Sequence, residues 1–148
     1  MGIKEQVDAV VVSMEVAERP CLFVLLANDG TVNRMGTGTA DNVEKALFVG
    51  PAPGALFKRF MSGVDEAIFE NAGVYKLPEP EGKLCKLELA FRRPGGPVGF
   101  EFHFGTEGQG PPPEISELVK LAIELTEPWY EAEKQKAAVE ATQDMEED

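Results

Sequence analysis

Residues 84–104 read LCKLELAFRRPGGPVGFEFHF, and they give the clearest structural signal in the chain. Apolar and polar residues alternate on both sides of the central prolines and glycines, as in two antiparallel strands joined by a tight turn. With Gly95-Gly96 as the loop, Phe91 is expected opposite Phe100, and one face of the pair becomes apolar throughout. The other face then carries Lys86, Glu88, Ala90, Arg92, Gly99, Glu101 and His103. The stretch therefore predicts a hairpin that buries one face and exposes the other.

A second hairpin is predicted near the start of the chain. Alternating valines and Met14 predict a strand over residues 7–16. Residues 21–27 are apolar on both faces, which is typical of a central strand covered above and below. Asn28-Asp29-Gly30 supplies residues that suit a turn with positive φ, so residues 31–37 are predicted to return as the next strand.

Three helical segments are predicted from capping and periodicity. Asp41 and Glu44 have the spacing of a capping box, which predicts a short helix over residues 41–49. Between residues 54 and 73 apolar side chains recur at helical spacing, and Gly63 marks a bend. Residues 115–125 have an amphipathic helical pattern, after which Thr126-Glu127-Pro128 predicts a second helix and a change of direction.

These elements predict an α+β fold. Two hairpin units that flank a helical segment indicate an antiparallel sheet of about five strands, with helices packed on one face and a helical C-terminus. The length of 148 residues suits one domain with its own core. We assign residues 1–136 to this domain and expect residues 137–148 to form an acidic, frayed tail, because they are poor in apolar side chains.

The charge balance excludes several classes of partner. The chain carries 14 basic and 26 acidic residues, for a formal net charge of −12. Such a field repels nucleic acid and anionic membranes, whereas it attracts a basic protein. Cys21 and Cys85 both stand in apolar segments, which predicts buried free thiols, a reducing compartment and a cytoplasmic location.

His103, Glu88 and Glu101 are the candidate catalytic residues. The expected register places His103 opposite Glu88, with Glu101 two residues away on the same face. One imidazole and two carboxylates can act as an acid/base pair or contribute to a divalent metal site. A cross-strand polar pair on a solvated sheet face explains the same residues without a ligand, and we favour that interpretation. No metal or cofactor is predicted.

Two further sites have competing interpretations. Gly36 and Gly38 precede the helix start predicted at Asp41, where backbone N–H groups can hold a phosphate. A dinucleotide fingerprint requires Gly or Ala at the position of Asp41, so a strand-to-helix turn is favoured there. Trp129 and Tyr130 are candidate interaction residues, since both types are enriched at interfaces, although they also serve to close the edge of a core.

No stretch matches a catalytic or cofactor motif, so the sequence predicts a non-catalytic protein-binding module of the immunity, adaptor or inhibitor type. Its acidic surface or tail would steer a basic partner, and assembly into a homo-oligomer stays open. The alternative is a small-molecule-binding protein or enzyme with a pocket between the sheet and the helices. In that case His103, Glu88 and Glu101 would be the polar groups of the pocket.

Overall fold

The computed structural model describes residues 2–36, 47–52, 55–76, 81–108 and 110–146. The strands found in these residues are β1 (Ala9–Val16), β2 (Arg19–Ala27), β3 (Thr31–Gly36), β4 (Leu47–Pro51), β5 (Gly73–Lys76), β6 (Leu84–Arg92) and β7 (Val98–Gly105). The helices are α1 (Ile3–Gln6), α2 (Leu56–Ser62), the 3-10 helix η1 (Glu66–Asn71) and α3 (Pro113–Glu146). The predicted α+β class is confirmed.

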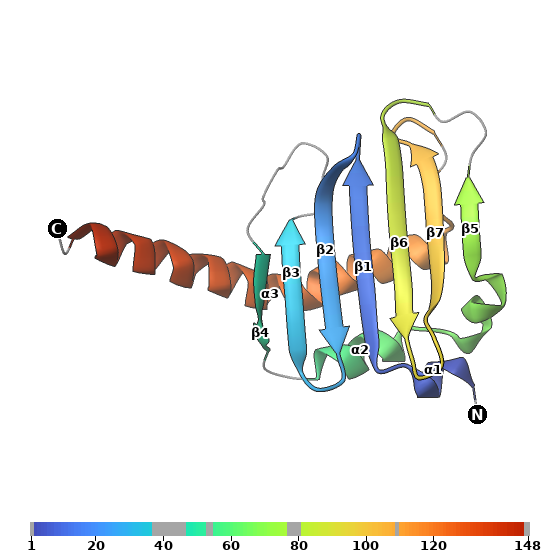
Figure 1. Ribbon diagram of the computed structural model, residues 1–148, viewed down its shortest axis with the longest axis horizontal. Helices are drawn as coiled ribbons and strands as arrows, with labels where there is room; N and C mark the ends of the chain where they lie inside the picture. The colour runs from blue at the N-terminus through green and yellow to red at the C-terminus, as the bar shows by residue number, and fades with distance from the viewer. Residues whose placement is uncertain (1, 37–46, 53–54, 77–80, 109, 147–148) are drawn as a thin grey trace.

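Within the described residues the strands form one seven-stranded sheet in the order β4-β3-β2-β1-β6-β7-β5 (Figure 1). The expectation of about five antiparallel strands is wrong in two respects. Both edge strands, β4 and β5, were missed, and β5 runs parallel to its neighbour β7. The sheet is therefore mixed, with its single parallel pair at one edge of the described structure.

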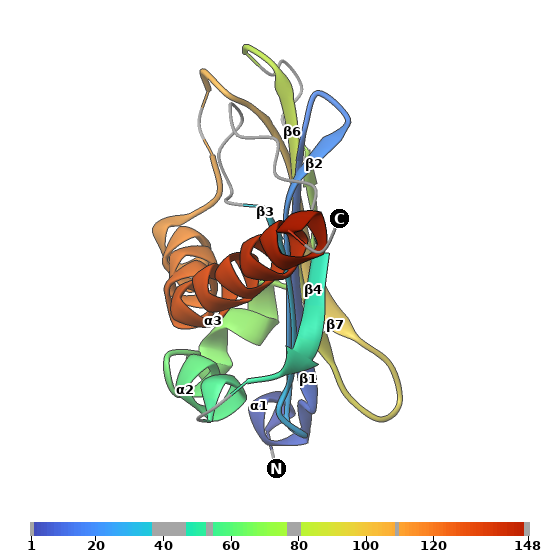
Figure 2. The same ribbon diagram turned by 90° about the vertical axis from the view of Figure 1, so that its left-hand side faces the viewer.

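The helices α2 and α3 lie on the same side of the sheet (Figure 2). Strand β2 is central, as predicted, but the prediction that it is covered above and below is wrong. Its inward residues Leu22, Val24 and Leu26 are each 1% exposed, whereas Phe23 and Leu25 point to the uncovered face and are only half-buried. The sheet thus has one helix-covered face and one open face.

The hairpin of β6 and β7 has the predicted faces but a different register. Leu89 lies opposite Phe100, a displacement of two residues from the expected pairing. The cause is the turn, in which the Gly96 N–H donates to the Arg93 carbonyl at 3.2 Å and Gly95 has a φ of 94°. Pro before a glycine of positive φ is the arrangement of a type II turn, so the turn centres on Pro94-Gly95. A shift of two residues leaves every side chain on its predicted face.

Two helix predictions also change. Residues 47–51 pair with β3 as strand β4 instead of continuing a helix, and residues 41–46, with the predicted capping box, lie outside the described residues. The helical pattern between residues 54 and 73 divides at Gly63 into α2 and η1, as its predicted bend indicates. Residues 73–76, for which no strand was predicted, form the short strand β5.

The C-terminal helix is one element and not two. Helix α3 spans 34 residues and contains Pro128, so the predicted break at that proline is wrong. At about 1.5 Å per residue such a helix is roughly 50 Å long. It crosses the sheet and projects beyond β4 (Figure 1). Its backbone is helical to Glu146, and the expected fraying of residues 137–148 stays a prediction. Neither α3 nor any other helix of the described residues is apolar enough over its length to cross a membrane.

The core lies between the covered sheet face and the helices. Phe91 is fully buried, and its ring meets Phe69 of η1 edge-on with centroids 4.9 Å apart. Phe100 and Phe102 of β7 are 4% and 7% exposed. The aromatic face of the second hairpin is therefore part of the core, as the alternation of residues 84–104 predicts.

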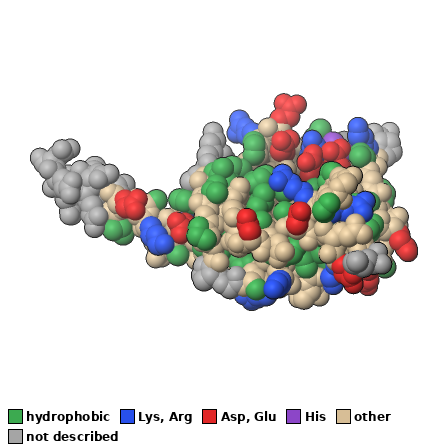
Figure 3. All heavy atoms as spheres, turned by 60° about the horizontal axis from the view of Figure 1, so that its bottom comes forward, with side chains coloured by type: hydrophobic (Ala, Val, Ile, Leu, Met, Phe, Trp, Pro, Cys, Tyr) green, Lys and Arg blue, Asp and Glu red, His purple; other side chains and the backbone are tan. Residues whose placement is uncertain are grey.

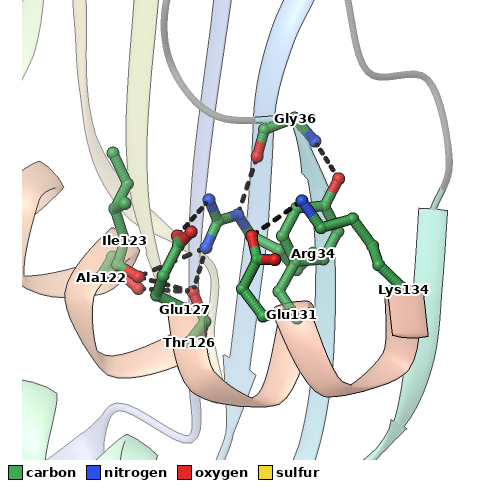
Figure 4. Close-up of polar contacts among 9 residues, drawn as sticks. Arg34, Gly36, Ala122, Ile123, Thr126, Glu127, Glu131 and Lys134 are labelled. Carbon is green, nitrogen blue, oxygen red and sulfur yellow. Dashed lines mark hydrogen bonds and ion pairs between the residues drawn. The ribbon is translucent and has the colours of Figure 1, made fainter. Parts of the chain in front are cut away.

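A buried arginine fastens α3 to the sheet (Figure 4). Arg34 of β3 faces the helices and has no exposed surface. Its Nε donates to the Gly36 carbonyl at 3.0 Å, and its Nη1 donates to Thr126 Oγ1 at 2.9 Å and to the Ile123 carbonyl at 3.3 Å. Its Nη2 pairs with the Glu127 carboxylate at 3.0 Å. Three of these four hydrogen bonds therefore join β3 to the middle of α3, and the fourth stays within β3.

Two aromatic residues of α3 add further contacts between the helix and the strands, and we call these contacts together with the bonds of Arg34 the anchor. The Arg34 guanidinium carbon lies 4.5 Å from the centroid of the Tyr130 ring, a cation–π distance. The Tyr130 hydroxyl accepts the Gly36 N–H at 3.1 Å. Next to it, the Trp129 indole N–H donates to the Pro51 carbonyl at 3.2 Å. Strands β3 and β4 are thus both tied to the same turn of α3.

Arg34→Lys should lower the free energy of unfolding by about 2 to 3 kcal/mol, because an ammonium group cannot replace the fork of donors that reaches four acceptors. Chemical denaturation followed by circular dichroism measures the loss. Arg92→Lys is the matched control, since Arg92 is exposed on β6, and should change stability by less than about 0.5 kcal/mol. Equal losses in the two variants would show that the buried anchor does not stabilise the fold.

Candidate functional site

The three candidate catalytic residues lie on the open face of the sheet, on β6 and β7. In the observed register Glu88 is opposite Glu101, and His103 is opposite Lys86, so the expected pairing of His103 with Glu88 is wrong. His103 Nε2 lies 2.7 Å from a Glu101 carboxylate oxygen. Lys86 Nζ is 2.9 Å from Glu88 and 3.9 Å from Glu101. The four side chains form a network that we call the charged stripe.

The side chains of the charged stripe stabilise one another in their charged forms. The hydrogen bond from His103, with smaller contributions from Glu88 and Lys86, lowers the pKa of Glu101. The hydrogen bond and charge of Glu88 raise the pKa of Lys86. Both shifts move the pKa values of Glu101 and Lys86 farther from neutral pH. A general acid or base is most effective when its pKa lies near the working pH. Among the described residues no three His, Cys, Asp or Glu side chains are grouped as metal ligands.

Gly36 already has partners for both of its backbone groups, the Tyr130 hydroxyl and the Arg34 Nε. Its φ is +79°, and an added Cβ would lie 2.1 Å from the Cys21 carbonyl oxygen, so the close approach of β2 requires glycine here. Gly38 lies outside the described residues. In this structure Gly36 serves strand and helix packing.

The candidate interaction residues Trp129 and Tyr130 are 9% and 0% exposed. Both belong to the contact of α3 with the sheet. Phe48 of β4 meets the Tyr130 ring edge-on with centroids 5.7 Å apart. The described surface of the protein therefore presents little of either ring to a partner.

Cys21 and Cys85 are buried free thiols, as predicted. Burial raises the pKa of both, and the neighbouring Cys85 raises that of Cys21 further. Because the thiolate is the reactive form, these shifts keep both sulfurs unreactive.

A groove lies between the sheet edge β7–β5 and the first half of α3, and the alternative prediction also expected a pocket between the sheet and the helices. Its volume is about 1300 Å³. His103 lies at its margin, but Glu88 and Glu101 are not among its lining residues. The structure therefore does not gather the three candidate catalytic residues in one cavity.

The floor of the groove is aromatic. The Phe102 ring stacks on Tyr75 with centroids 5.1 Å apart and on Phe100 with centroids 6.5 Å apart. Tyr75 is 44% exposed, so this stack reaches the surface. Apolar side chains of η1, β7 and α3 continue the lining: Ile68, Phe104, Ile115, Leu118 and Leu121.

The rim of the groove is mainly acidic. Asp65, Glu114, Glu117 and Glu124 are exposed lining residues, against the two basic residues Lys76 and Lys120. Three of the acids come from α3, at positions that place them along one side of the helix. Sequence reasoning did not identify these lining residues, because they come from four separate segments of the chain. The only available signal was the run of glutamates beside the apolar positions of residues 115–125.

His103→Ala should change the free energy of unfolding by less than about 1 kcal/mol, as expected for an ion pair near the surface. Loss of the imidazole hydrogen bond should raise the pKa of Glu101 toward its ordinary value. In the wild type the lowered pKa stabilises the fold at neutral pH, and this contribution disappears as the pH falls through the Glu101 pKa. Carboxyl carbon NMR titrations measure the shift. Stoichiometric metal in the purified wild type that is lost in the variant would contradict a purely structural pair.

Comparison with protein-family models, with curated proteins and with solved structures finds no match. The function must therefore be inferred from the groove and from the surfaces themselves.

Proposed function

We propose that this protein is a non-catalytic protein-binding module that holds a basic, amphipathic helical segment of another protein in the groove. The observation that carries the proposal is the combination of an aromatic floor with a rim on which exposed acids outnumber bases by four to two. Helix-in-groove recognition uses apolar anchors at helical spacing, and basic side chains beside those anchors would meet the acidic rim.

The dimensions of the groove support a helical segment. Small-molecule sites usually enclose roughly 300 to 1,000 Å³, and this groove is larger. A helix with its side chains is about 10 to 12 Å wide. The exposed end of the aromatic stack at Tyr75 offers a contact for an apolar anchor, while Glu117 and Glu124 are spaced along α3 for two successive basic residues.

Long-range charge supports the same class of partner. The net charge of −12 raises the rate at which a basic molecule encounters this protein. Immunity proteins, adaptors and inhibitors are the types of module that such recognition fits. The buried free thiols support the further proposal of a reducing, cytoplasmic location.

The groove is tested with a synthetic Leu/Lys amphipathic helix of about 15 residues, long enough to form several turns. We expect calorimetry to give saturable binding, weakened at least about tenfold by Tyr75→Ala and by the double variant Glu117→Lys and Glu124→Lys. The double variant Glu5→Lys and Glu18→Lys, which reverses two exposed charges outside both the groove lining and residues 137–148, is the matched control and should have a much smaller effect. Equal weakening by the control and the rim variant would indicate non-specific attraction and would contradict the groove as the site.

The acidic end of α3 should contribute to encounter and not to folding. Residues 137–148 carry five acidic and no basic residues, and Val139 is 55% exposed. Deletion of residues 137–148 should leave the melting temperature nearly unchanged and should slow association of the same peptide at low salt, with little change in dissociation. Stopped-flow fluorescence measures both rates. A large loss of thermal stability would show that the segment packs against the domain.

A further inference from the structure

The open face of the sheet is apolar over its half nearest β4. Side chains alternate between the two faces of a strand, so the register places outward residues of adjacent strands in rows. One row contains Val49, Asn33, Leu25 and Val11, and the next contains Leu47, Met35 and Phe23. We define the open apolar patch as Val11, Phe23, Leu25, Met35, Leu47 and Val49.

The patch is accessible in the described structure. Leu47 is 53% exposed and Val49 is 61% exposed, and the other four side chains are half-buried. Figure 3 shows hydrophobic side chains beside the group of acidic, basic and histidine side chains on this side of the molecule. Contiguous apolar surface of this kind is uncommon on a monomer unless it is an interaction site.

The same face has balanced charge on a strongly acidic protein. Its outward charged residues on the described strands are Glu15, Glu88 and Glu101 against Lys76, Lys86 and Arg92. The face is therefore formally neutral with His103 uncharged, although the chain as a whole carries −12. Repulsion between two copies of the chain is lowest when these faces meet, and a basic partner gains least there.

From these observations we infer that a second copy of the chain packs on the open face, sheet against sheet. Aligned sheets pack through interdigitated side chains, and a two-fold axis through the patch brings apolar half onto apolar half. The charged stripe then forms a polar border, as is usual around the apolar centre of an interface. This inference does not depend on the proposed function of the groove, which lies between the β7–β5 edge and α3; of the outward charged and histidine residues of the open face, only Lys76 and His103 also line the groove.

The area is sufficient for a weak dimer. Seven strands about 4.8 Å apart, with about five residues each at about 3.3 Å, offer roughly 550 Å² per copy. Two such faces bury roughly 1,100 Å², slightly above the approximately 1,000 Å² that a specific interface requires. We therefore expect a dimer that dissociates in the micromolar range.

Sedimentation velocity of the full chain between about 1 and 200 µM tests the inference, since that range spans a micromolar dissociation constant. We expect conversion from monomer to dimer, and at least a tenfold rise in the dissociation constant for both Val49→Glu and Leu47→Lys. Val139→Glu is matched in residue type and exposure but lies on α3, and it should leave the constant unchanged.

The substitutions replace exposed side chains, and thermal melting by circular dichroism verifies that each variant is folded. A wild type that stays monomeric at every concentration would overturn the inference, as would a dimer that both patch variants leave intact. No peptide is present in the experiment, so its failure leaves the groove proposal untouched, and failure of peptide binding leaves the dimer untouched.

Discussion

The rest of the structure depends on the buried guanidinium of Arg34. An ion removed from water is costly unless its donors are satisfied, and Arg34 meets this requirement only when Thr126, Glu127 and the Ile123 carbonyl are in place. An apolar contact tolerates sliding, whereas this set of acceptors fits one axial position and one rotation of α3. The anchor therefore fixes which side of the helix faces β7 and β5, and with it the wall of the groove.

Different parts of α3 have different roles: its middle binds the sheet and its first half lines the groove. Its middle holds the sheet through polar and aromatic contacts, and its first half is left with an apolar side toward Phe102 and an acidic side toward solvent. The groove exists because the helix is held at a distance set elsewhere. Changes in the rim can then alter recognition without disturbing the anchor.

Much of the fold follows from period-two alternation, which is why the faces of β6 and β7 were predicted correctly even though their register was not. The loop could be centred on Gly95-Gly96 or on Pro94-Gly95. Only the preference of proline for the second position of a turn favours Pro94-Gly95. Arg34 was missed because a single basic residue in a strand is usually exposed, and its inward direction depends on pairing with a distant helix. Strands β4 and β5 are short edge strands. Strand β4 falls in the segment for which the capping box predicts a helix, and β5 pairs with β7, a later segment of the chain, so local pattern reveals neither.

The strand order has a consequence for the way the chain is made. Strand β1 lies at the centre of the sheet between β2 and β6, so its second neighbour is synthesised only after more than half of the chain. The hydrogen bond from Arg34 to Thr126 spans 92 residues. Contacts of such separation slow folding, because a long loop must close before they form. During synthesis strands β1 to β3 therefore have both apolar faces exposed until the later segments are made. A chaperone that shields these strands until α3 emerges would be of most value in that interval.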